Sequence, residues 1–211
     1  MQKTISSDRK PGVTGHLIHI GYPKAGSNFL RRWFAAHPQL AYAEGGIAGF
    51  ANVLDIARQG AAAPDGIRCR VTSHEALSIP VRDVGQPRID GEKRELPLEA
   101  TQARACDMLA STFSDAHILI VTRGFRSIML SAYSQYVRTG GSRDLEVLAG
   151  GHRGENPWNY DYLIGLYERA FGADRLIVLP YELLRDDAGA FLGVLQRHLG
   201  VGPCHVATDR L

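Results

Sequence analysis

The sequence predicts an α/β fold, a three-layer sandwich in which helices cover both faces of a central parallel sheet. Two observations lead to this prediction. Short apolar runs typical of buried strands alternate along the chain with longer stretches in which apolar residues recur every three or four positions, as they do in helices. The 211 residues are 45% hydrophobic and 22% charged, which is the composition of a globular domain and excludes a disordered or collagen-like chain.

The first half of the chain begins with a segment, residues 1–15, that is predicted to be a polar leader. The apolar run HLIHIGY at residues 16–22 predicts a buried strand that ends at Pro23. The run NFLRRWFAA at residues 28–36 has helical spacing and ends before Pro38. The other elements expected here are strands at residues 40–43 and 68–73 and a helix at residues 50–58.

The second half begins with a long excursion and then repeats the alternation of helix and strand. Residues 77–96 contain prolines, glycines and many charges, which predicts a surface loop suited to a lid or to substrate contact. The most apolar strand is AHILIVT at residues 116–122. The other predicted elements are helices at residues 98–113, 125–139, 158–171 and 187–199, a Gly-rich loop at 150–157 and a strand at 176–179. No repeat or linker divides residues 16–211, so we expect a single domain.

The loop GYPKAGSN, at residues 21–28, has the character of a phosphate site. It lies between a predicted strand end and a helix start, where free backbone N–H groups and the helix dipole favour an anion, and Lys24 adds a positive charge. Its two glycines have P-loop spacing, but Ser27 and Asn28 stand where a Walker A motif has Lys and Ser or Thr. The strand at residues 116–122 is followed by Arg123, whereas a Walker B strand ends in an acidic metal ligand. The pattern therefore predicts an anionic nucleotide bound without a metal ion.

Three motifs resemble those of the sulfotransferases that use 3′-phosphoadenosine-5′-phosphosulfate (PAPS). Residues 23–29, PKAGSNF, resemble the family's loop PK-[ST]-G-[ST]-[ST]-x, with departures at Ala25 and Asn28. Arg123, followed eight residues later by Ser131, resembles the family's second signature, although Gly-Phe replaces the usual Asn-Pro after the arginine. The segment LIVLPYEL at residues 176–183 resembles a third motif, a strand followed by YE-x-L. The resemblance covers residues 16–201 and implies a P-loop NTPase-like sulfotransferase fold.

The resemblance also implies roles for individual residues. Lys24 would neutralise charge on the leaving 5′-phosphate, and Arg123 and Ser131 would bind the 3′-phosphate. Phe29 would lie near the adenine, unless it is a core residue of its helix, and the same two readings apply to Tyr181. The residues expected to bind the nucleotide are Lys24, Ala25, Gly26, Ser27, Asn28, Phe29, Arg123, Ser131 and Tyr181. The implied reaction moves the sulfuryl group of PAPS to a hydroxyl or an amine and leaves 3′-phosphoadenosine-5′-phosphate (PAP), with no metal.

Three residues compete for the base that removes the acceptor proton. His74 follows a predicted strand at the edge where open α/β folds bind ligands, and it resembles the histidine of cytosolic family members. Glu44 resembles the glutamate of Golgi-type members, and Glu75 stands next to His74 and could orient it. We favour His74 over Glu44.

Composition and the ends of the sequence bear on the partners, the cellular location and the branch of the family. The net charge of +2 gives no case for nucleic-acid or membrane-surface binding, and no signal peptide or membrane span is expected. The three cysteines form no CxxC pair, which favours reduced thiols in the cytoplasm. The chain lacks the family's RKG segment, which favours a bacterial or carbohydrate-type branch over the cytosolic small-molecule branch. A small-molecule, carbohydrate or lipid acceptor is favoured over a protein, and a homodimer is left open. The alternatives are a P-loop nucleotide kinase and a non-catalytic nucleotide-binding domain.

Overall fold

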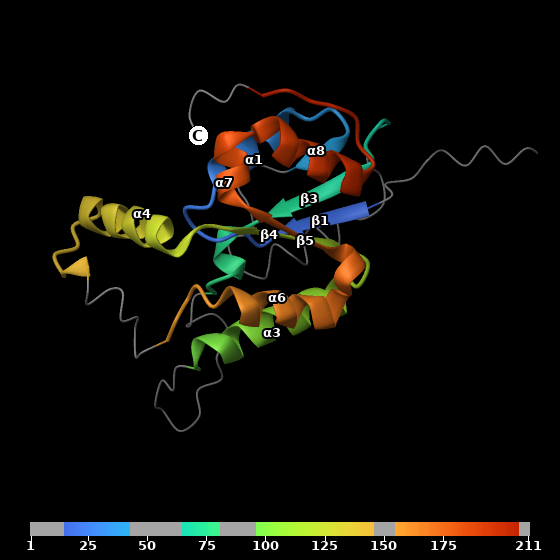
Figure 1. Cartoon of the computed structure of the whole chain (residues 1–211). Coiled ribbons are helices and arrows are strands. Elements are labelled where there is room, and N and C mark those ends of the chain that lie inside the picture. Colours follow the sequence, from blue (N-terminus) through green and yellow to red (C-terminus); the bar gives the residue numbers. More distant parts are fainter. Residues whose placement is uncertain (1–14, 43–64, 81–95, 146–154, 207–211) are drawn as a thin grey trace, which may run out of the picture.

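A computed structural model describes residues 15–42, 65–80, 96–145 and 155–206 (Figure 1). Three sequence predictions fall wholly or mostly outside these residues, namely the polar leader at residues 1–15, of which Gly15 is described, the helix at residues 50–58 and the Gly-rich loop at residues 150–157. Most of the predicted surface excursion at residues 77–96 also lies outside them.

The centre of the described structure is a five-stranded sheet in which every neighbouring pair is parallel. The strand order is β2-β3-β1-β4-β5, so β1 is the middle strand. The strands are β1 (Gly15–His19), β2 (Leu40–Tyr42), β3 (Cys69–Ser73), β4 (His117–Thr122) and β5 (Leu176–Pro180). Burial explains the apolar runs, because four consecutive residues of β4 are buried, as expected for a strand covered on both faces.

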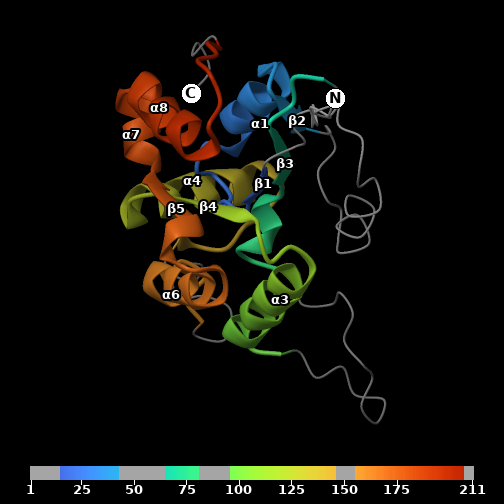
Figure 2. The same ribbon diagram turned by 90° about the vertical axis from the view of Figure 1, so that its right-hand side faces the viewer.

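Helices cover both faces of this sheet, which gives three layers (Figures 1 and 2). One face is covered by α1 (Ser27–Ala36), α7 (Tyr181–Asp186) and α8 (Ala188–Leu199). The other face is covered by α3 (Leu98–Thr112) and α6 (Tyr160–Phe171), which pack against each other. The helix α4 (Phe125–Arg138) instead extends away from the sheet beyond the end of β4. The predicted α/β three-layer fold is confirmed.

Helix boundaries follow local chemistry. The helix α1 buries the side chains Phe29, Leu30, Trp33 and Phe34 on one face and ends before Pro38. Asn159 caps α6 by accepting a hydrogen bond from the N–H of Tyr162 at 3.3 Å. Asp187 caps α8 in the same way through the N–H of Ala190 at 2.8 Å.

The structure differs from the sequence prediction most clearly in three places, while several other element ends differ by one residue. The first strand ends at His19, three residues earlier than predicted, because the chain enters a turn in which the N–H of Ala25 donates to the carbonyl of Tyr22 at 3.2 Å. The helix α6 begins at Tyr160 rather than at residue 158, because Asn159 is its cap. The six-residue helix α7 was not predicted, since it is too short to show a helical period and directly follows a strand.

Candidate functional site

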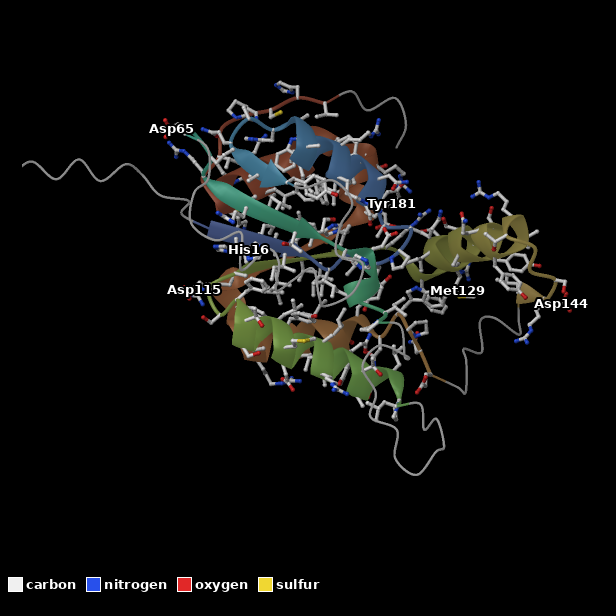
Figure 3. The ribbon with its side chains drawn as sticks, turned by 180° about the vertical axis from the view of Figure 1, so that it is seen from behind. His16, Asp65, Asp115, Met129, Asp144 and Tyr181 are labelled. Atoms are coloured by element: carbon white, nitrogen blue, oxygen red, sulfur yellow. The ribbon has the colours of Figure 1, made fainter. Side chains whose placement is uncertain are left out.

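The candidate site lies at the carboxyl edge of the sheet, where four neighbouring strands end. The loop at residues 21–28 follows β1, His74 and Glu75 follow β3, Arg123 follows β4, and Tyr181 follows β5. The chain runs from β1 to β2 on one side and from the neighbouring strand β4 to β5 on the other side, and open parallel sheets bind ligands at such a point. Figure 3 shows Tyr181 at this edge, beside the base of α4, with His16 and Asp115 toward the opposite end of the sheet.

The loop that follows β1 has a backbone suited to a close ligand approach. Gly21, Lys24 and Gly26 all have positive φ, at 35°, 69° and 86°. Lys24 is the one described non-glycine residue with this conformation, which an L-residue adopts at a cost. The carbonyl of Gly26 accepts the first hydrogen bonds of α1, from the N–H groups of Phe29 and Leu30. The N–H groups at the start of α1 are therefore turned toward this loop.

Ser27 carries an unsatisfied polar atom at the start of α1. The residue is 4% exposed, and its hydroxyl has no hydrogen-bond partner within the described part of the chain. A buried hydroxyl without a partner is costly, so an oxygen of a bound anion would satisfy it. Ser27 and the N-terminus of α1 thus fit the phosphate that the sequence predicts.

Arg123 connects the end of β4 to this loop. Its Nη1 donates to the carbonyl of Lys24 at 2.5 Å, and its Nε donates to the hydroxyl of Ser127 at 2.9 Å. Its guanidinium lies over the ring of Tyr181, 4.5 Å from the ring centre, in a cation–π contact. The structure therefore brings together Lys24, Arg123 and Tyr181, residues that lie far apart in the sequence.

These side chains surround a pocket of about 250 Å³. Its walls combine cationic, hydroxyl and aromatic groups, as a phosphorylated nucleoside requires. The lining residues are Lys24, Gly26, Ser27, Asn28, Phe29, Glu75, Arg123, Ser131 and Tyr181. Eight of the nine residues expected to bind the nucleotide line this pocket, and the ninth, Ala25, is fully buried in the loop.

Phe29 and Tyr181 line the pocket and also have structural roles. Phe29 is 1% exposed and belongs to the hydrophobic core, so only a small part of its ring faces the pocket. Tyr181 is partly buried, packs against the same core and faces Arg123. The core reading therefore holds for both aromatics, and both also line the pocket, while their contact with the adenine stays a prediction.

The three candidates for the base have different positions. Glu75 lines the pocket, and its carboxylate accepts a hydrogen bond from Arg31 of α1 at 3.1 Å. His74 is next to it and half-buried, and among the described residues it is not part of the pocket wall. Burial lowers the pKa of His74, while the nearby carboxylate of Glu75 acts in the opposite direction. Glu44 lies outside the described residues.

A buried histidine packs against Gly21, at the start of the loop at residues 21–28. His19, at the end of β1, is fully buried, and its Nδ1 is 2.8 Å from the hydroxyl of Ser73. Burial, together with the charge of Arg31, lowers its pKa to about 3, so the imidazole is neutral at neutral pH. A Cβ atom on Gly21 would lie 2.6 Å from its Nε2, so only glycine fits above this ring.

Sequence reasoning missed three residues that hold Arg123 and its neighbour. Ser127 is not among the residues expected at the site, yet it accepts the Nε hydrogen bond of Arg123; the four-residue spacing of the two is the available signal. Glu182 accepts a hydrogen bond from the N–H of Gly124 at 2.9 Å, and the hydroxyl of Tyr160 bonds to the main chain of Arg123. The last two contacts join separate elements, and no sequence spacing indicates them.

Two features are absent from the described residues, a cluster of metal ligands and a membrane-spanning helix. In this part of the chain, no three His, Cys, Asp or Glu residues come together as a metal site would need. None of the helices that the structure describes has the length and hydropathy of a membrane span.

Comparison with solved structures supports the reading of the fold. A sulfotransferase from Alicyclobacillus acidocaldarius matches 92% of this chain with a TM-score of 0.62 and 17% identity, and the match covers 87% of that protein. The chain has the sulfotransferase fold. The sulfotransferase domain from the curacin biosynthetic pathway matches 91% of the chain, with a TM-score of 0.55 and 14% identity, over 76% of its own length.

A complex with nucleotide is also among the proteins with this sulfotransferase fold. Mouse sulfotransferase SULT7A1, solved with PAP, matches 90% of the chain with a TM-score of 0.55 and 13% identity. The present chain spans 60% of the mouse protein. Searches against protein-family models and against curated protein sequences gave no match.

Proposed function

We propose that this protein is a PAPS-dependent sulfotransferase that moves a sulfuryl group to a hydroxyl or an amine of an acceptor. The observation that carries the proposal is one pocket in which the loop of Lys24 and the start of α1 face Arg123 and Ser131. These are two separate groups of anion-binding residues, as a nucleotide with a 5′-phosphosulfate and a 3′-phosphate needs. The PAP complex of the mouse protein with the same fold supports this choice of nucleotide.

PAPS supplies an activated sulfuryl group, whose sulfur–oxygen bond to the 5′-phosphate breaks as a bond to the acceptor forms. Lys24, Ser27 and the N–H groups at the start of α1 stabilise the charge that grows on the departing phosphate. Arg123 and Ser131 hold the 3′-phosphate and so fix the position of the reacting bond. As in phosphoryl transfer, such positioning and charge stabilisation supply most of the catalysis.

We assign to His74 the role of the base that removes the proton of the acceptor. Its imidazole stands at the carboxyl edge of β3, and its lowered pKa keeps it neutral, and therefore able to accept a proton, at neutral pH. Glu75 lines the pocket, but its carboxylate accepts a hydrogen bond from Arg31. This pairing suits a role in orienting His74. Glu44 is the alternative base.

The free thiols of Cys69, Cys106 and Cys204 favour a cytoplasmic protein. For the acceptor we propose a small molecule, a carbohydrate or a lipid.

The experiment that tests the function is a screen of such acceptor pools with isotopically labelled PAPS, read by mass. A product that gains SO₃ in an enzyme-dependent manner supports the proposal. A nucleotide kinase would instead consume ATP with magnesium, and a non-catalytic domain would bind PAP without any product.

A further inference from the structure

One side chain from the far face of the sheet reaches both loops of the pocket. Tyr160 is the first residue of α6, and it lies outside every motif discussed above. Its hydroxyl donates to the carbonyl of Arg123 at 2.8 Å and accepts from the N–H of the same residue at 3.3 Å. A hydroxyl has one proton to donate and lone pairs to accept, so this one group satisfies both main-chain polar groups of Arg123.

The ring of Tyr160 contacts the other loop. It packs edge to face against the ring of Tyr22, with 4.8 Å between ring centres and 80° between planes. Tyr22 is fully buried and stands two residues before Lys24. The hydroxyl of Tyr160 therefore fixes the chain at Arg123, and its ring fixes the chain that leads into Lys24.

The position of the Arg123 main chain determines what its guanidinium can reach. With the main chain held by Tyr160, Nη1 reaches the carbonyl of Lys24, Nε reaches Ser127, and the planar group lies over Tyr181. Lys24 has the positive φ of 69°, and the hydrogen bond to its carbonyl helps to hold this unfavourable conformation. Arg123 and Lys24 are thus set relative to each other before any ligand binds.

We propose that Tyr160 is a positioning residue that holds Arg123 and the Lys24 loop in register for the nucleotide. The assignment of the ligand rests on the proposed function, since Arg123 is taken to bind the 3′-phosphate of PAP. Burial also raises the pKa of Tyr160, so its hydroxyl keeps the proton that it donates to Arg123 throughout the neutral range.

The test is Tyr160→Phe, which keeps the ring contact with Tyr22 and removes only the hydroxyl. Binding of PAP and of adenosine 5′-monophosphate, which lacks the 3′-phosphate, is measured by calorimetry. We expect Tyr160→Phe to weaken PAP roughly tenfold, because two main-chain groups lose their partner, and to change adenosine monophosphate by less than about threefold. Tyr162→Phe is the matched control: its hydroxyl donates to the carbonyl of Glu99 at 2.9 Å, away from the pocket, and both affinities should stay unchanged.

The outcomes separate this inference from the proposed function. If the wild-type protein fails to bind PAP, or binds both nucleotides equally, the proposed ligand is wrong. If the wild-type protein prefers PAP and Tyr160→Phe keeps the same ratio of affinities, the role of Tyr160 is wrong. A partly unfolded variant would weaken both ligands by the same factor, so the ratio still decides.

Discussion

Replacing Gly26 with alanine tests whether the loop geometry is needed for the ligand. Gly26 has φ 86° and ψ 11°, a left-handed conformation that costs an alanine about 1–2 kcal/mol. Its new Cβ would lie 2.6 Å from Cδ2 of Leu184 and 3.3 Å from Cδ2 of Tyr181. Relief of that overlap must shift the buried side chain of Leu184 and the ring of Tyr181, both on α7, and overpacking of this kind adds about 1–3 kcal/mol. The free energy of unfolding should therefore fall by about 2–5 kcal/mol.

The matched control is Gly200→Ala at the end of α8. Gly200 is also left-handed, with φ 62° and ψ 30°, but a Cβ there would meet no described atom within 4 Å. It should lose only the conformational part, about 1–2 kcal/mol. Urea unfolding gives both free energies, and calorimetry at a temperature where both variants are folded gives their affinity for PAP.

The two variants should separate in binding as well as in stability. Because a shifted Tyr181 ring loses its contact with Arg123, Gly26→Ala should weaken PAP binding more than tenfold, while Gly200→Ala should bind PAP like the wild-type protein. Equal PAP affinity in the two variants would refute the reasoning that packing between the loop and α7 shapes the site.

Three further predictions concern charge and protonation. Lys24→Ala should lower sulfuryl transfer by at least tenfold with little change in melting temperature, because its charge acts mainly on the transition state; a loss within about threefold would contradict this role. His74→Ala should lower kcat/KM by about 10²- to 10⁴-fold with PAP affinity kept, whereas an inactive Glu44→Ala beside an active His74→Ala would transfer the role of base. In acid, the free energy of unfolding should fall as the pH drops below about 6.5. Burial lowers the pKa of His16 to about 4 and that of His19 to about 3. Below about pH 6.5 the unfolded chain therefore binds protons that the folded chain excludes. Between pH 7 and 5 each histidine should contribute a loss of about 2 kcal/mol, and stability that stays flat over this range would show that neither is buried as described.

The sheet and the loop that lines the pocket after β1 could be predicted because their signals are local. The run at residues 116–122 is apolar enough to be only a buried strand, and Arg123 follows it directly. In the loop at residues 21–28, the glycine spacing and one lysine predict a phosphate site. Parallel strands then bring such residues to one edge without further information.

Other parts of the site could not be predicted because they depend on contacts between distant elements. Tyr160 reaches Arg123 from the opposite face of the sheet, and Glu182 reaches Gly124 from α7, a helix too short to show a period. From the sequence, His74 is the favoured base and Glu75 a neighbour that could orient it, whereas in the fold Glu75 is the one of the two that lines the pocket. A difference of one residue after a strand changes which side chain lines the pocket, and spacing alone does not predict which one it is.

The most direct test of the central claim is thermal and urea unfolding of the wild-type protein with PAP in a buffer containing a chelator. If the pocket takes PAP without a metal ion, a free concentration of 100 times Kd should raise the free energy of unfolding by about 2.7 kcal/mol. Arg123→Ala should lose most of this gain, because the 3′-phosphate would have lost its cationic partner. Stabilisation that appears only with magnesium, or that is equally large with ATP, would contradict the account and favour a nucleotide kinase.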